Sequence, residues 1–155
     1  MTEAFLGQLG IGLALGMGAL GSALGIGAAG RAAAGAWAKE GKAGKPLNFK
    51  YVIFVGMPLT QTAYAFLLLY IGLSKGVYDA QMLAANAGAY FGIGLACGLA
   101  ELFSAWMQGL IGAAGCRCLS EAEGKGMAFI IFAMGIAETV GLLGFVFLWL
   151  MLPKA

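Results

Sequence analysis

The sequence predicts an all-α integral membrane protein whose four transmembrane helices form two duplicated helical hairpins. Three observations support this fold class: the composition, four long apolar segments and an internal repeat. Of the 155 residues, 61% are hydrophobic and only 10% are charged, whereas a soluble domain carries roughly 25% charged residues. The mean hydropathy is +0.90. Such a chain is suited to a bilayer rather than to water.

Four apolar segments each exceed the roughly 20 residues that are needed to cross the hydrocarbon core. They cover residues of about 5–35, 50–73, 84–115 and 127–152. The breaks between them are polar and glycine-rich, as expected for loops. Because unpaired backbone groups are too costly in lipid, helices are the expected state of all four. We therefore predict one membrane domain, 1–155, built from a first hairpin at 5–73 and a second at 84–152.

The first and third segments share a repeated motif and a high glycine content. "GIGLALGMGALGSA" (Gly10–Ala23) aligns with "GIGLACGLAELFSA" (Gly92–Ala105), with nine identities in fourteen positions. Small residues let membrane helices approach closely, so the glycines of the first helix predict a packing surface. The N-terminus lacks the basic region of a cleavable signal peptide, so the first helix is expected to be retained.

The second and fourth segments align more weakly, with "MPLTQT" (Met57–Thr62) over "MGIAET" (Met134–Thr139). In this alignment Gln61 lies opposite Glu138, so one copy has a carboxylate and the other a neutral amide. The chain therefore predicts a duplicated hairpin in which only the second copy keeps the acid. Pro58 cannot donate a hydrogen bond to the carbonyl of Phe54 and is expected to bend the second helix.

Positive charges predict the orientation of the helices, because lysine and arginine concentrate in cytoplasmic loops. The first and third loops are basic and are expected to face the cytoplasm. The middle loop and the ends carry few basic residues, so both termini are expected outside the cell membrane. The basic residues of the first and third loops are Arg31, Lys39, Lys42, Lys45, Lys50, Arg117 and Lys125.

Polar side chains from three helices are predicted at one depth in the membrane. Gln61 follows Lys50 by eleven residues, Gln108 precedes Arg117 by nine, and Glu138 follows Lys125 by thirteen. At about 1.5 Å per residue, all three lie roughly 13–20 Å inside the basic boundary. Intramembrane polar groups are costly and mark ion pathways.

These groups offer an all-oxygen shell of one carboxylate, two amides, the Thr60 hydroxyl and a backbone carbonyl. Hard cations take such ligands, and one carboxylate would neutralise one monovalent ion. A proton on Glu138 would need no shell, so the amides and the threonine favour a metal ion. Gln61, Gln108 and Thr60 could instead hold the helices together by hydrogen bonds.

Two further residues are left open by the sequence. Tyr64 shares a helix face with Gln61 and serves either in packing or as a hydrogen-bond partner that holds Glu138. Glu101 lies seven residues before Gln108, on much the same face. It is either a second proton or ion group, or it faces the lumen or a partner.

Several other functions are disfavoured by the composition. A net charge of +2 gives no support for binding nucleic acid. The chain has three cysteines and no histidine. Cys116 and Cys118 alone cannot complete a zinc site, so the cysteines are interpreted as reduced structural thiols. No motif predicts an organic cofactor.

Three motifs carry a resemblance to a known family: "PLTQTAY" (Pro58–Tyr64), "FSAWMQG" (Phe103–Gly109) and "AETVGLLGF" (Ala137–Phe145). Together with the duplicated hairpin, they resemble the membrane rotor proteolipid of V-type ATPases, the c or K subunit, in its bacterial sodium-transporting branch. The resemblance covers nearly the whole chain. It implies a closed homo-oligomeric ring of identical subunits, with the first and third helices inside and the second and fourth outside.

The resemblance also implies a mechanism and a set of ion ligands. One Na⁺ per subunit would ride around the lipid-facing perimeter, and an arginine of a stator subunit would displace it. Central-stalk subunits would couple rotation to ATP hydrolysis elsewhere, so the chain is not an enzyme by itself. Two positions depart from the family pattern, Met57 and Glu101. The implied ligands are the Met57 carbonyl, Thr60, Gln61, Gln108 and Glu138, with Tyr64 as a supporting hydrogen bond.

Two other functions are also compatible with the sequence. The same rotor could carry H⁺, with the polar residues as partners of a protonated Glu138. Alternatively, the chain could be a small four-helix exporter of cationic drugs that works as a dimer. An exporter does not predict the duplication, the glycines or the amides.

Overall fold

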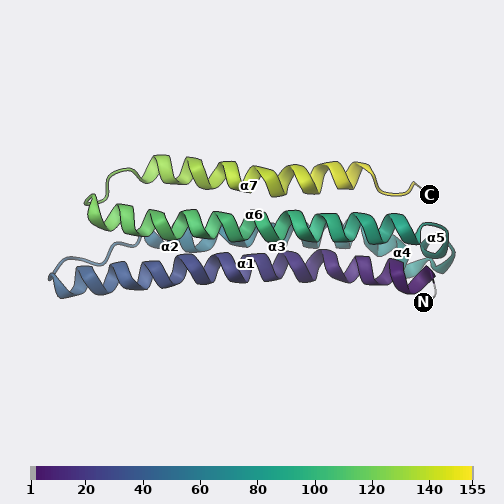
Figure 1. Cartoon of the computed structure of the whole chain (residues 1–155), viewed down its shortest axis with the longest axis horizontal. Helices are drawn as coiled ribbons and strands as arrows, with labels where there is room; N and C mark the ends of the chain where they lie inside the picture. The colour runs from purple at the N-terminus through teal and green to yellow at the C-terminus, as the bar shows by residue number, and fades with distance from the viewer. Residues whose placement is uncertain (1–2, 155) are drawn as a thin grey trace.

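The computed structural model describes residues 3–154, and within that range every regular element is a helix (Figure 1). Three of the four membrane-spanning units are single helices: α1, α6 and α7. The remaining unit is composite and lies between α1 and α6 in the chain. The elements are α1 (Glu3–Lys42), α2 (Tyr51–Gly56), η1 (Met57–Leu59), α3 (Thr60–Leu67), η2 (Leu68–Leu73), α4 (Ser74–Tyr78), α5 (Ala80–Ala85), α6 (Ala87–Glu121) and α7 (Met127–Leu150).

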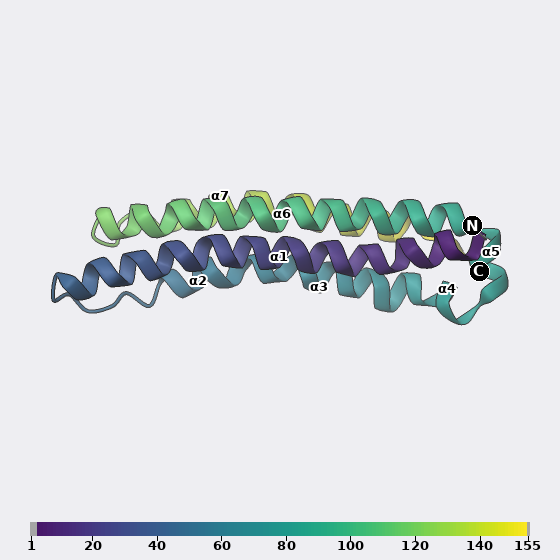
Figure 2. The same ribbon diagram turned by 60° about the horizontal axis from the view of Figure 1, so that its bottom comes forward.

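The four units are long and apolar enough to cross a membrane, which confirms the predicted fold class. They cover Ala4–Lys42, Tyr51–Tyr78, Ala87–Glu121 and Met127–Leu150. They run side by side along the long axis, and both ends of the chain lie at the same end of the bundle (Figures 1 and 2). The loops after α1 and α6 lie together at the opposite end.

Two predicted helix ends are wrong. The apolar segments predict that the first helix ends near residue 35 and the third near 115, but α1 continues to Lys42 and α6 to Glu121. The apolar pattern marks only the part of a helix that lies in hydrocarbon. Alanine, lysine and glutamate are strong helix formers, so both helices continue beyond the apolar region.

The segment bounds also predict a loop after residue 73, and this prediction is partly wrong, because "SKGVY" (Ser74–Tyr78) forms α4. The chain turns at Asp79, which has extended backbone angles and caps the short helix α5. Its carboxylate accepts hydrogen bonds from the backbone N–H groups of Gln81 and Met82. A carboxylate at this position satisfies donors that a helix N-terminus leaves free.

The second spanning unit departs from regular α-helix at two places. At Pro58 it tightens into the 3₁₀ turn η1, because proline lacks the N–H that a helix interior uses. The segment Leu68–Leu73 widens into a π-helical turn, a feature that is frequent near functional sites. Between these two irregular turns lies α3, which carries Thr60, Gln61 and Tyr64.

Glycines let α1 and α6 pack backbone to backbone. A side chain on Gly94 would meet the backbone of Gly10, and one on Gly109 would meet the backbone of Gly25. The predicted packing surface on the first helix therefore exists, and it faces α6. Other glycines of the same helix, such as Gly12 and Gly16, would have no atom within 4 Å of an added Cβ.

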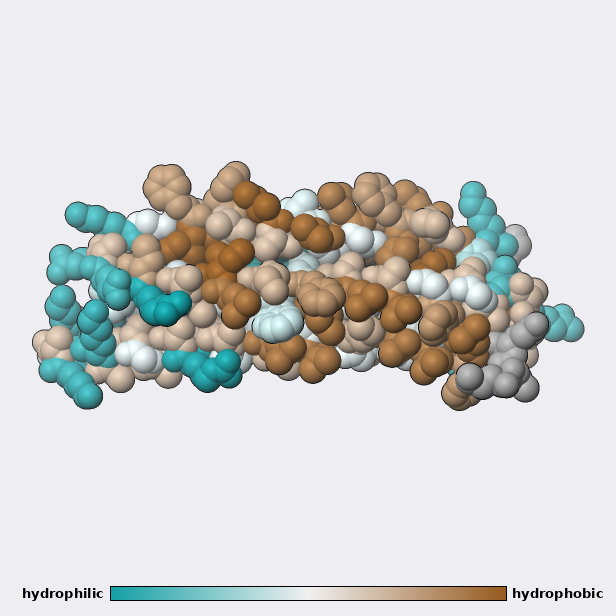
Figure 3. All heavy atoms as spheres, in the orientation of Figure 1, coloured by the Kyte–Doolittle hydropathy of each residue, from teal (hydrophilic) through white to brown (hydrophobic). Residues whose placement is uncertain are grey.

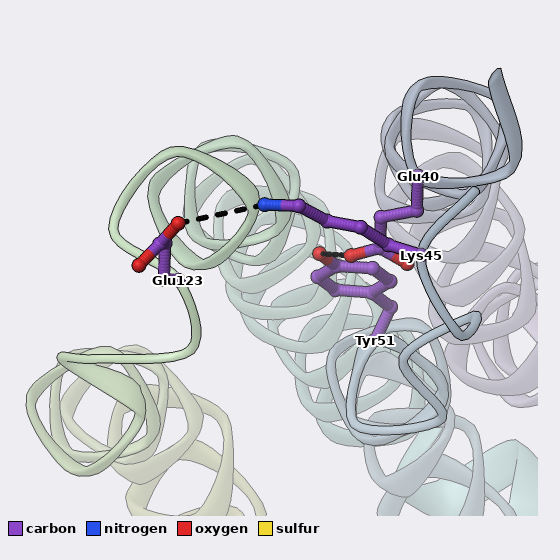
Figure 4. Close-up of polar contacts among 4 residues, drawn as sticks. All are labelled: Glu40, Lys45, Tyr51 and Glu123. Carbon is purple, nitrogen blue, oxygen red and sulfur yellow. Dashed lines mark hydrogen bonds and ion pairs between the residues drawn. The ribbon is translucent and has the colours of Figure 1, made fainter. Parts of the chain in front are cut away.

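The loop end of the bundle is held by a small polar cluster (Figure 4). The carboxylate of Glu40 accepts hydrogen bonds from the Tyr51 hydroxyl and from the Asn48 backbone N–H. Lys45, in the loop after α1, forms an exposed ion pair of 3.4 Å with Glu123, in the loop after α6. The contacts of Glu40 lie within the first hairpin, whereas the ion pair of Lys45 with Glu123 connects the two hairpins outside their apolar region.

Figure 3 shows hydrophilic residues at the two ends of the molecule and a broad hydrophobic band between them. Many large apolar side chains in this band are exposed on α7, among them Phe132 at 72% and Val140 at 61%. A surface of this kind is suited to lipid or to other membrane helices. The polar groups of the candidate site, on α3, α6 and α7, lie in the spans that form this band.

Candidate functional site

Glu138 lies on α7 and is half-buried on the side that faces α3 and α6. Its two oxygens have different partners. The Tyr64 hydroxyl of α3 donates to Oε1 at 3.1 Å, and the Gln108 amide of α6 donates to Oε2 at 3.2 Å. The carboxylate is therefore held between two helices. Tyr64 therefore has both of the roles that the sequence leaves open. Its hydroxyl is a hydrogen-bond partner of Glu138, and its ring packs by stacking on Phe145.

Gln108 is fully buried and occupies the centre of the cluster. Its Nε2 donates to Glu138 and also to the backbone carbonyl of Met134, at 3.2 Å in each case. Its Oε1 accepts a hydrogen bond of 3.1 Å from Nε2 of Gln61. The amide therefore connects α7 with α3 from its position on α6.

Gln61 is also fully buried and begins the α3 side of the cluster. Its Oε1 lies 3.1 Å from the Thr60 hydroxyl, which is itself 3.0 Å from the carbonyl oxygen of Met57. The 3₁₀ turn at Pro58 places this carbonyl beside the threonine. The Thr60 hydroxyl has a single hydrogen, so it donates to one of these two oxygens at a time. From Gln61, hydrogen bonds continue through Gln108 to Glu138.

This arrangement provides oxygens that one hard cation could contact. The Met57 carbonyl, the Thr60 hydroxyl and Gln61 Oε1 are linked by separations of 3.0 and 3.1 Å. Neighbouring oxygens lie about this far apart around a cation that binds them at roughly 2.3–2.6 Å. The carboxylate supplies one negative charge, which matches one monovalent cation. The structure brings all six predicted site residues into one network.

Ser104 belongs to the same network but is not among the site residues that the sequence predicts. Its hydroxyl donates to the Ala137 carbonyl at 2.8 Å and accepts from Gln61 Nε2 at 3.1 Å. Ser104 lies one helical turn before Gln108, so the i, i+4 spacing could have placed it on the same face. It takes the second hydrogen of the Gln61 amide and thereby fixes that amide's orientation.

Glu101 is completely buried, at 0% exposure. Neither of its side-chain oxygens has a hydrogen-bond partner among residues 3–154. Of the alternatives that the sequence leaves open, an orientation toward the lumen or a partner is wrong, because the side chain lies inside the subunit. It comes close to Gly18 of α1 and Gly141 of α7, so it occupies the space between three helices.

Comparison with known proteins identifies the family of this chain twice. The family model for the C subunit of ATP synthase matches residues 9–71 and again residues 91–151. The two matches coincide with the two hairpins and together cover most of the chain. Curated proteins give no significant sequence match. The duplication that the repeat predicts is thus independently visible in the family match.

Proposed function

The chain belongs to the family of ATP synthase C subunits, and we propose that it is the sodium-carrying rotor subunit of a V-type enzyme. Members of this family form homo-oligomeric rings in the membrane part of ATP synthase and carry ions. They catalyse nothing alone. Our proposal has three parts beyond this family role: the transported ion is Na⁺, the enzyme is of the V-type, and specific residues of this chain bind the ion.

The observation that carries the proposal is the oxygen shell around Glu138. A rotor site for protons needs only a carboxyl group and something to hold it. Here two buried amides, a hydroxyl and a carbonyl lie in one network with the carboxylate. Burying polar groups is costly unless they are hydrogen-bonded, and a protonated carboxyl alone does not require so many of them at one depth in the membrane. A cation that needs several oxygens explains why three helices supply them together.

The proposed binding step exchanges hydrogen bonds for ion contacts. Na⁺ would bind to Glu138, to Oε1 of Gln61 and Gln108, to the Thr60 hydroxyl and to the Met57 carbonyl. Tyr64 would keep its hydrogen bond to Glu138 and hold the carboxylate. With one charge neutralised, the site could pass along the lipid-facing side of the ring at a lower energetic cost.

The V-type assignment rests on the duplication and on the distribution of carboxylates. Each hairpin matches the family, but only the second has a carboxylate at the aligned position, and Gln61 stands in the first. One ion would therefore be carried per four helices.

Basic loops after the first and third spans support our proposal that these loops face the cytoplasm. The ring would turn against a stator subunit that bears an arginine.

The test is carbodiimide labelling of Glu138 in purified rings, across pH, with and without Na⁺. The reagent modifies a protonated buried carboxyl, so bound Na⁺ is expected to slow the labelling. The variant Gln108→Ala should weaken this protection, because it removes one ligand. Gln81→Ala serves as the matched control, because Gln81 is an exposed glutamine far along the chain from the site.

Two results would decide against parts of the proposal. If labelling follows pH and ignores Na⁺, the rotor carries protons and the cluster only holds the carboxyl group. If Na⁺ protects equally in Gln108→Ala and in wild type, Na⁺ binds but the ligand set is wrong. A protein that runs as a dimer instead of a large ring on native gels would favour the drug exporter.

A further inference from the structure

The carboxyl group of Glu101 has no role in the proposed ion shell, yet it lies in the most enclosed part of the subunit. It is at 0% exposure, whereas Glu138 is half-buried. Among the described residues it has no hydrogen-bond donor and no ion pair. An ionised carboxylate in such surroundings is uncompensated and costs many times the energy of a neutral group.

The position of the group is defined by α7 and α6. A Cβ atom on Gly141 would lie 2.6 Å from Oε2 of Glu101 and 2.9 Å from the hydroxyl of Ser104. Both oxygens therefore border the same small space, which a side chain at 141 would crowd. On the other side, the side chain of Glu101 starts 3.5 Å from a Cβ built on Gly18 of α1.

The hydrogen-bond capacity of Ser104 indicates which form of Glu101 fits this space. A serine hydroxyl has one hydrogen and two lone pairs. The hydrogen goes to the Ala137 carbonyl, and one lone pair accepts from Gln61. The structure contains no hydrogen bond between Ser104 and Glu101, so the lone pair that is left is free to accept the hydrogen of a protonated carboxyl. An ionised Glu101 would instead face an oxygen whose only hydrogen is already used.

We propose that Glu101 is a second, closed proton site, which holds a resident proton that the ring does not transport. The ligand is H⁺ itself. Each subunit would then bind two ions of different fate: the exchangeable one at Glu138 and a permanent proton at Glu101. The inference goes beyond the proposed function and does not depend on which ion Glu138 carries.

The titratable neighbours of Glu101 support a neutral form. Glu138 of α7, Tyr64 of α3 and Cys97 of its own helix are the groups whose charge interacts with it. The part of α1 beside it contributes Gly18 and no titratable side chain. A negative charge on Glu101 would lie near the Glu138 carboxylate, and no lysine or arginine of the described residues forms an ion pair with it. The proton removes this repulsion and keeps the transported charge at one per subunit.

The test is infrared spectroscopy of purified rings, which detects the carbonyl stretch of a protonated carboxyl directly. In wild type at neutral pH and saturating Na⁺, we expect one such band from within the membrane. The band should be lost in Glu101→Gln and retained in Glu138→Gln. Because Glu138→Gln keeps Glu101 as the only carboxyl inside the apolar region, it gives the answer even if Glu101→Gln rings do not assemble.

Each other result has a defined meaning. Absence of the band from wild type and from Glu138→Gln would overturn the proposal, because Glu101 would then be ionised. A band of Glu101 that disappears when Na⁺ is added would also overturn it, because the proton would be exchangeable. If a carbonyl band of protonated Glu138 is unchanged when Na⁺ is added, while the Glu101 band is present, the assignment of Na⁺ to Glu138 is wrong and the resident proton at Glu101 is supported.

Discussion

Tyr64 and Glu138 are joined across α3 and α7 by a hydrogen bond of 3.1 Å, in which the phenol donates to Oε1. The bond connects the two hairpins at the depth of the candidate site. It also gives Oε1 of the carboxylate a fixed hydrogen-bond partner. The opposite oxygen accepts from Gln108, so the orientation of the carboxylate is set from both sides before any ion arrives.

The first prediction concerns this bond. Tyr64→Phe removes the hydroxyl and keeps the ring that stacks on Phe145. A hydrogen bond to a charged group contributes about 1.5–3 kcal/mol, so we expect the Na⁺ concentration that half-protects Glu138 to rise by about tenfold or more. Tyr70→Phe is the matched control, since Tyr70 is 65% exposed and lies away from the carboxylate. Equal protection in both variants would contradict a supporting role for Tyr64.

The second prediction concerns helix packing. Gly94→Ala places a methyl group against the backbone of Gly10, whereas Gly92→Ala meets no atom within 4 Å. Overpacking costs about 1–3 kcal/mol, and two backbones cannot move apart as a side chain can. We expect Gly94→Ala to lower the temperature at which purified rings dissociate by several degrees, and Gly92→Ala to change it little. Equal midpoints would show that α1 and α6 do not need this close approach.

The third prediction concerns the loop end of the bundle. Tyr51→Phe removes a hydrogen bond to Glu40 in a buried position, and we expect a loss of about 1 kcal/mol in stability. Lys45→Ala removes an ion pair whose side chains are 60% and 77% exposed, so its effect should be near zero. Thermal unfolding of both variants measures the difference. A larger effect from Lys45→Ala would mean that this ion pair matters more than its exposure indicates.

Much of the architecture could be predicted from the sequence because the bilayer restricts the choices. Long apolar segments can only be helices in lipid, and the duplication is visible in aligned residues. The ends of α1 and α6 could not be predicted from hydropathy, since Lys42 and Glu121 lie beyond the apolar region. Their helical state depends on intrinsic propensity and on contacts such as that of Glu40 with Tyr51.

The candidate site was partly predictable for a similar reason. Carboxylate, amide and hydroxyl groups at one depth indicated which side chains would meet, and Gln61, Gln108 and Glu138 do meet. The surroundings of Glu101 were not predictable. Its helix face was clear, but only the packing of Gly18 and Gly141 shows that the group is enclosed. Ser104 was not among the predicted ligands, although its i, i+4 spacing from Gln108 places both side chains on one helix face.

The last prediction concerns competition between protons and Na⁺ at Glu138. A proton and Na⁺ use the same carboxylate, and a metal ligand must lose its proton before the ion binds. As the pH falls and Glu138 becomes protonated, the half-protecting Na⁺ concentration should rise, approaching about tenfold per pH unit. At high pH the carboxylate is free and the concentration should become constant. Carbodiimide labelling at several fixed Na⁺ concentrations measures this curve.

The shape of that curve also separates the two carboxyl groups. Because the proton of Glu101 is resident, Glu101→Gln should leave the proton–Na⁺ competition at Glu138 in place, whereas Gln108→Ala should move the whole curve to higher Na⁺ concentrations. A half-protecting concentration that does not change with pH would mean that Na⁺ acts away from Glu138. If the competition itself disappears in Glu101→Gln, the proton that opposes Na⁺ sits on Glu101, and the assignment of the exchangeable ion to Glu138 is wrong.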